Sequence, residues 1–168
     1  MSRLFVALWP PAEVLEVVAA LPRPEERGVR WSRPDQWHVT VRFLGEVEDV
    51  GEAVTAVDAV SASSVTATMG PVTEVLGRTI LVAPVAGIEA VAEAVISATA
   101  EVGRPPETRP FNGHLTLARG KRPGPVRRLA GESCAASWTV DEVVLVESHL
   151  GSESARYEDV ARVALSLP

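Results

Sequence analysis

The chain has 168 residues, of which 16 are basic and 22 acidic, and its formal charge is −6. A hydrophobic content of 46% excludes a disordered chain, and the single cysteine, Cys134, excludes a disulfide framework or a cysteine-rich zinc site. No apolar run approaches the roughly 20 residues of a membrane helix, and the run 4–9 is too short for a signal-peptide core. We expect a cytoplasmic globular protein with no membrane segment.

The first part of the chain predicts a strand, a helix and a second strand. Residues 3–9 (RLFVALW) are strand-like, and an apolar stripe at helical spacing follows at 14–21. Residues 37–44 (WHVTVRFL) are rich in β-branched and aromatic side chains, which favour a strand. A further helix is expected within 49–60 and a strand at 65–69.

The same order returns at an offset of about 76 residues. Residues 79–85 (TILVAPV) predict a strand, residues 88–102 carry an apolar helical face, and residues 113–119 (GHLTLAR) predict another strand. The remaining chain is expected to form a loop with one helical turn and two closing strands, at 120–131, 138–148 and 157–165. The matched order predicts an internal duplication within one two-lobed α+β domain spanning 1–168.

Two of the three histidines are followed by a threonine two positions later, and they coincide at this offset. His38 and Thr40 fall on His114 and Thr116. Residues i and i+2 of a strand point to the same face, so each pair projects together. A pseudo-twofold axis would place both pairs around one cleft.

This constellation suits a phosphodiester. Imidazole has an ordinary pKa near 6.5, so one ring can accept a proton from water while the other donates one to the departing oxygen. Threonine hydroxyls can donate hydrogen bonds to the non-bridging oxygens, where charge develops. The spacing alone does not assign the two roles.

The motifs resemble the 2H phosphoesterase superfamily, and more closely its bacterial and archaeal RNA 2′,3′-cyclic phosphodiesterases, also called 2′-5′ RNA ligases. The resemblance extends from the opening RLFVALWPP through WHVTVRFLGEV and FNGHLTLAR to VLVESHL and Tyr157. A departure lies at Asn112-Gly113, where that family often has a proline before the histidine.

The resemblance implies a bilobal, pseudo-twofold fold in which antiparallel sheets line a central cleft and helices lie outside. It implies opening of a 2′,3′-cyclic phosphate on RNA ends or nucleotides to a 2′-phosphate, with no metal or cofactor. It assigns the proton donor to His38, the proton acceptor to His114, and substrate binding to Thr40 and Thr116.

Basic residues are concentrated between 104 and 128. They are Arg104, Arg109, Arg119, Lys121, Arg122, Arg127 and Arg128, against the single acid Glu107. Such a stretch is either a solvated loop or a local phosphate-binding surface. Arg119 and Arg42 are further candidates for substrate binding. Strict alternation puts Arg42 on the His38 face and Arg119 opposite His114, unless strand twist or a bulge turns Arg119 back.

Structural roles are favoured for four other residues, and whether Tyr157 or His149 touches the substrate stays open. Phe43 is expected in the core, His149 and Tyr157 in structural or packing roles, and Cys134 as an inert thiol.

Three alternatives stay open beside a metal-independent cyclic phosphodiesterase. The reverse chemistry would join RNA ends through a 2′-5′ linkage. A metallophosphoesterase is disfavoured, because Asp35 is the only acid close in sequence to either motif histidine. A non-catalytic RNA- or nucleotide-binding module would use the arginine-rich stretch alone. The absence of a heptad or an apolar surface repeat favours a monomer.

Overall fold

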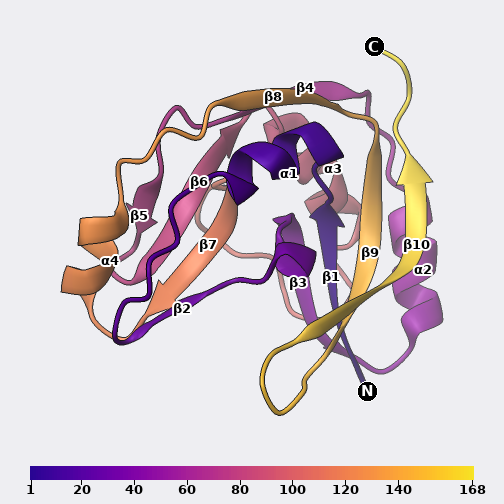
Figure 1. The fold of residues 1–168 in the computed structure, drawn as a ribbon. Coiled ribbons are helices and arrows are strands. Elements are labelled where there is room, and N and C mark those ends of the chain that lie inside the picture. Colours follow the sequence, from indigo (N-terminus) through magenta and orange to yellow (C-terminus); the bar gives the residue numbers. More distant parts are fainter.

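Ten strands form one curled antiparallel sheet in the computed structural model, which describes residues 1–168 (Figure 1). The strands are β1 (Ser2–Leu8), β2 (Val29–Trp31), β3 (Val39–Val47), β4 (Val65–Met69), β5 (Glu74–Leu76), β6 (Ile80–Ala86), β7 (His114–Gly120), β8 (Ala136–Val140), β9 (Glu142–His149) and β10 (Arg156–Ala164). Their order is β10-β9-β1-β3-β7-β6-β4-β8, with β2 paired to β7 and β5 to β6. The predicted α+β architecture of antiparallel sheets is confirmed.

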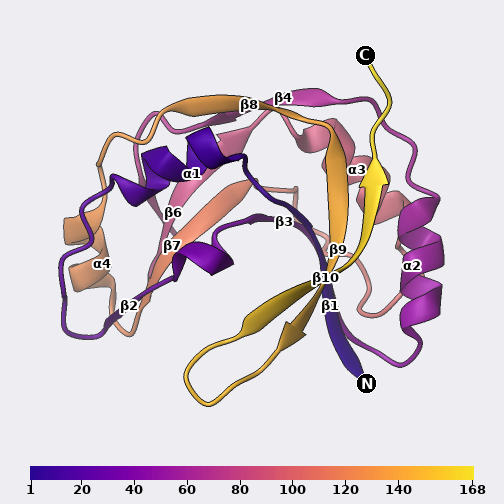
Figure 2. The same cartoon turned by 45° about the vertical axis from the view of Figure 1, so that its right-hand side comes forward.

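Four helices pack against this sheet. They are α1 (Ala12–Ala19), α2 (Val50–Asp58), α3 (Glu89–Ala98) and α4 (Pro123–Leu129), and a single 3₁₀ turn lies at Pro34–Gln36. Helix α3 packs on β3, α2 on β9 and β10, α1 on β8, and α4 on β6 and β7. Figure 2 shows the sheet arching between the β9–β10 hairpin on one side and β7 with β2 on the other. No helix combines the length and apolarity needed to cross a membrane.

The two halves of the sheet meet where β3 pairs with β7. Between these two strands, only Val39 and Leu115 face each other as a residue pair. They are 76 positions apart, which is also the offset at which the two His-x-Thr motifs align. An antiparallel pair between equivalent positions is what a twofold axis through the junction would produce. Strand β1 then lies beside β3 as β6 lies beside β7. The duplication itself stays a prediction, with which this pairing agrees.

Strand β1 is buried on both faces, which fixes it in the middle of its half. Leu4, Val6 and Leu8 face the large core beneath the helices. Phe5 and Ala7 face the other way, into a small cluster on the concave side of the sheet. That cluster also contains Val144 and Val146, with Trp9, Phe43 and Tyr157 packed against it. The concave side of the sheet therefore carries a separate apolar cluster.

The prediction of one strand over 138–148 is wrong. Strand β8 ends at Val140 and β9 begins at Glu142, and the two belong to opposite ends of the sheet: β8 pairs with β4, whereas β9 pairs with β1. The chain changes partner at Asp141, a break that the continuous run of valines concealed. The short strands β2 and β5 were also missed, because three residues carry too little pattern to indicate a strand.

Gly113, the residue before His114, lies against the backbone of β6. A Cβ atom at this position would meet the Val85 carbonyl oxygen and come within 3.1 Å of Ile88 Cδ1. The Val85 N–H donates to the Gly113 carbonyl oxygen at 2.9 Å, so the two backbones are held together at this point. The close approach fixes where β7, and with it His114, enters the sheet.

We expect Gly113→Ala to destabilise the protein by about 1–3 kcal/mol, because the added methyl group must displace backbone rather than a flexible side chain. Urea unfolding measures the change. Gly124→Ala is the matched control: Gly124 lies in α4, and its added methyl would meet only Arg128 Nη1, at 3.8 Å. That variant should be as stable as the wild type or slightly more so. Equal stability of Gly113→Ala and the wild type would contradict the close approach.

Candidate active site

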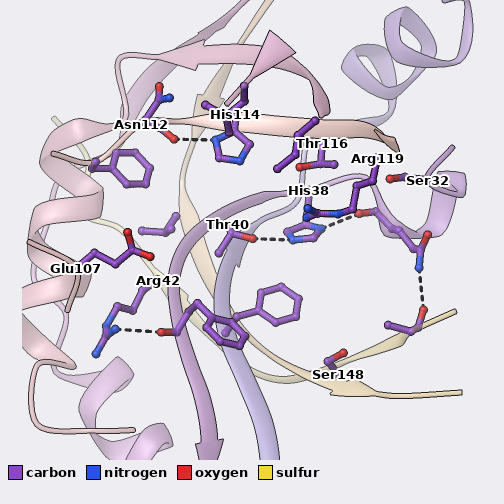
Figure 3. A pocket seen from close by; sticks show the side chains of 18 of the residues that line it. Ser32, His38, Thr40, Arg42, Glu107, Asn112, His114, Thr116, Arg119 and Ser148 are labelled. Carbon is purple, nitrogen blue, oxygen red and sulfur yellow. Dashed lines mark hydrogen bonds between the residues drawn. The ribbon is translucent and has the colours of Figure 1, made fainter. Parts of the chain in front are cut away.

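The four residues of the His-x-Thr motifs line one groove on the concave side of the sheet (Figure 3). The groove has a volume of about 1310 Å³. The structure thus brings His38, Thr40, His114 and Thr116 together, as predicted from their spacing. An antiparallel pair centred on Val39 and Leu115 sets residue 38 beside residue 116 and residue 40 beside residue 114.

Both imidazoles are held by the same kind of hydrogen bond. His38 Nδ1 lies 2.6 Å from the Gln36 carbonyl oxygen, and His114 Nδ1 lies 2.8 Å from the Asn112 carbonyl oxygen. A carbonyl oxygen can only accept, so each Nδ1 must carry the proton and donate. Each neutral ring therefore presents an unprotonated Nε2, and the two backbone acceptors are themselves 76 residues apart.

His38 is enclosed by aromatic side chains. Its ring centroid lies 4.9 Å from that of Phe5, 5.5 Å from that of Trp9 and 5.2 Å from that of Tyr157. Its Nε2 lies 2.9 Å from Thr40 Oγ1. This burial lowers the pKa of His38 below its ordinary value, and the nearby charges of His114 and Arg119 lower it further. The imidazole of His38 is therefore neutral in the resting protein at pH 7.

His114 has a more open setting. Its Nδ1 contact with Asn112 is its only hydrogen bond, and its Nε2 has no partner within the protein. The Thr116 hydroxyl also makes no hydrogen bond to another side chain or to the backbone. These two groups are free to contact a bound molecule in the groove, whereas the Nε2 of His38 is already engaged by Thr40.

A bulge in β3 decides which side chains follow Thr40 on the concave face. Thr40 and Arg42 pair with successive residues of β1, which leaves Val41 unpaired. An extra residue reverses the alternation of the strand beyond it. Phe43 consequently lies on the concave side and lines the groove, so the prediction that it belongs to the core beneath the helices is wrong.

An equivalent bulge in β7 turns Arg119 into the groove. Thr116 and Ala118 pair with successive residues of β6 and leave Leu117 unpaired. Leu117 is 76 residues after Val41, so the two bulges sit at matching positions. Arg119 is exposed and lines the groove beside the two histidines, so the bulge, one of the two alternatives to strict alternation, determines its side.

Arg42 does not project beside His38, where strict alternation along the strand would place it. Only 6% of the residue is exposed, and its guanidinium donates to the backbone carbonyls of Phe43, Thr99, Val102 and Arg104 and to the Thr99 hydroxyl. These donors are used on the protein itself. The prediction that Arg42 binds substrate is therefore replaced by a structural role, which joins β3 to the segment after α3.

The groove is positively charged although the chain is acidic. Its arginines other than the buried Arg42 are Arg3, Arg30, Arg104, Arg109 and Arg119, and its only acidic residue is Glu107, which pairs with Arg109. The arginine-rich stretch therefore contributes only in part: Lys121, Arg122, Arg127 and Arg128 do not line the groove. The sequence gives no signal for Arg3 and Arg30, because strand pairing with β3 and β7 brings them to the groove.

Of the three other residues for which structural roles were expected, only Tyr157 lies at the groove. Tyr157 lines the groove and packs edge-on against His38 and Phe5. His149 lies outside the groove, where its Nε2 contacts Glu158 at 3.0 Å and Glu147 at 3.8 Å. Cys134 is fully buried in the main core, and burial raises the pKa of its thiol.

We expect the imidazole of His38 to titrate below pH 6.5 in the free protein, because the aromatic enclosure disfavours its charged form. NMR of the imidazole nitrogens measures this and also reports the protonated Nδ1. The unfolded chain then binds the proton more readily than the folded one, so stability falls as pH drops below 6.5 towards the folded pKa. A His38 pKa above 6.5 would contradict the enclosure.

Comparison with known proteins agrees with this geometry. Residues 8–70 match the sequence model of the family described as LigT like Phosphoesterase. No curated protein is recognisably similar in sequence. The structure of TT0787 from Thermus thermophilus is 25% identical, with a TM-score of 0.82 over 98% of each chain. E. coli LigT complexed with 3′-AMP is 28% identical, with a TM-score of 0.75 over 98% of each chain.

A further solved structure, described as a phosphoesterase, is 28% identical with a TM-score of 0.74 over 98% of each chain. The segment that matches the family contains the first His-x-Thr motif, and the fold match extends over both motifs. The chain therefore has the LigT fold along almost its whole length, and its residues 8–70 carry the sequence signature of the LigT-like phosphoesterases.

Proposed function

We propose that this protein is a metal-independent RNA 2′,3′-cyclic phosphodiesterase that opens a cyclic phosphate to a 2′-phosphate. The observation that carries the proposal is the matched pair of imidazoles: His38 and His114 each donate Nδ1–H to a backbone carbonyl and line one positively charged groove. The complex of E. coli LigT with 3′-AMP supports a nucleotide as the ligand.

His114 is the proton acceptor of this proposal. Its Nε2 has no partner in the protein, so it can take a proton from a water molecule in the groove. The water oxygen then attacks phosphorus, and the bond between phosphorus and O3′ breaks. The phosphate remains on O2′, and the developing charge on the non-bridging oxygens is stabilised by the Thr116 hydroxyl and the Arg119 guanidinium.

His38 is the proton donor and returns one proton to the departing O3′. Its lowered pKa means that the resting enzyme holds it neutral, with the Thr40 hydroxyl donating to its Nε2. Binding of an anionic phosphate offsets the charge of Arg119, which disfavours protonation of His38. The donor is then charged when substrate is present, and Thr40 accepts from Nε2–H until the proton is transferred.

We expect His38→Ala and His114→Ala each to lower kcat on adenosine 2′,3′-cyclic phosphate by at least about 100-fold, the usual magnitude of one acid–base group. Turnover should be unchanged by EDTA. His149→Ala is the matched control, because His149 lies outside the groove, and it should retain wild-type kcat. Circular dichroism and thermal unfolding show whether each variant is folded.

Three results would contradict the proposal. One is a folded His38→Ala or His114→Ala variant with wild-type kcat. Another is loss of turnover in EDTA with recovery on adding a divalent metal, which would indicate a metallophosphoesterase. The third is a wild-type protein that binds nucleotides without turning them over, which is the behaviour of a binding module. Formation of 2′-5′ junctions from RNA halves would reveal the reverse reaction at this site. A cytoplasmic, monomeric protein remains our prediction.

A further inference from the structure

Beyond the histidines, one end of the groove holds two arginines on a single aromatic ring. The guanidinium carbons of Arg3 and Arg104 lie 4.8 and 5.7 Å from the centroid of Phe43. The two charges cannot be farther apart than the sum of these distances. They border a smaller hollow of about 430 Å³ that adjoins the groove and is also lined by Gly45, Glu46 and Gly103.

The position of Arg104 is fixed by its surroundings. Its N–H donates to the Leu44 carbonyl oxygen at 2.8 Å, and its carbonyl oxygen accepts from Arg42 Nη2 at 2.5 Å. Its side chain crosses β3 at Gly45, where a Cβ atom would lie 2.8 Å from Arg104 Cδ. The glycine leaves the space that this crossing needs, and the buried Arg42 is the positioning residue that holds the loop.

The charges of Arg3 and Arg104 have no acidic partner. Neither forms an ion pair, although Glu46 lines the same hollow and is opposite Arg3 in the β1–β3 pairing. A guanidinium stacked on a ring keeps the N–H groups at its edge free to donate. Two such cations near one ring repel each other, and an anion that accepts from both guanidinium edges offsets that repulsion and takes up the free donors.

The hollow is connected to the surroundings of His38 through strand β1. Phe5 contacts the ring of His38 and pairs with Phe43. Arg3 precedes Phe5 by two residues in β1, so both side chains lie on the same face of the sheet. Two residues of a strand span about 6–7 Å. This spacing is comparable with one nucleotide step along an RNA backbone. A cyclic phosphate ends the RNA, so any further phosphate must lie on its 5′ side.

We propose that Arg3 and Arg104 bind the phosphate 5′ to the nucleotide that carries the cyclic phosphate. This inference rests on the proposed function and names its substrate class: an RNA end of two or more nucleotides, in preference to a single nucleoside cyclic phosphate.

The test compares kcat/KM for three substrates: adenosine 2′,3′-cyclic phosphate, its 5′-phosphorylated form, and the dinucleotide ApA with a 2′,3′-cyclic phosphate. We expect both phosphate-bearing substrates to exceed the nucleoside by about 10-fold, an advantage that shrinks with salt because the site is solvent-accessible. Arg3→Gln and Arg104→Gln should each reduce this ratio, and the double variant should abolish it. Turnover of the nucleoside, which has no 5′ phosphate, should fall by less than that of the two phosphate-bearing substrates.

Arg127→Gln is the matched control, since it removes one exposed arginine outside the groove and should leave the ratio unchanged. Arg104→Lys keeps the charge and should keep part of the advantage. Equal kcat/KM for all three substrates, or an unchanged ratio in the double variant, would overturn the proposal. An advantage confined to the dinucleotide would also overturn it, because a base or ribose would then be the group recognised.

Calorimetry separates this proposal from failure of the proposed function. Adenosine 2′,5′-bisphosphate should bind the wild type about 10-fold more tightly than adenosine 2′-phosphate, and the double variant should bind the two equally. This difference in affinity is measurable whether or not the protein hydrolyses a cyclic phosphate. Equal affinities in the wild type would show that the arginines do not bind a 5′ phosphate.

Discussion

The pairing of Val39 with Leu115 is the contact on which the site depends. It joins the two halves of the sheet between the two His-x-Thr motifs, and every motif side chain lies within one residue of it. Each half alone would offer one imidazole and one hydroxyl. Joined at this pair, they present two of each to a single groove. The close approach of Gly113 to β6 and the hydrogen bonds at Gln36 and Asn112 then fix the rings.

The two halves share a geometry but differ in environment, and that difference gives the two histidines different properties. His38 lies among three aromatic rings and is hydrogen-bonded at both nitrogens, whereas His114 has a free Nε2. The matched bulges place an aromatic ring, Phe43, in one half and a cation, Arg119, in the other. Of the two imidazoles, only that of His38 is enclosed by aromatic rings, and this enclosure lowers its pKa.

Motif spacing predicted the residues of the site better than it predicted their neighbours. The His-x-Thr periodicity placed four side chains correctly, since it acts over two residues of a regular strand. Alternation failed at Phe43 and Arg42, because the bulge at Val41 is set by pairing with β1 and leaves no local signal. The β8–β9 break and the place of Arg3 likewise depend on strand partners far away in sequence.

We propose that both imidazoles contact one phosphate, and NMR of their side-chain nitrogens during titration with adenosine 2′-phosphate tests this contact. His149 provides an internal reference, because it lies outside the groove. We expect the Nε2 resonances of His38 and His114 to shift together with one dissociation constant, while those of His149 stay in place. A shift of only one of the two groove histidines, or of neither, would contradict it.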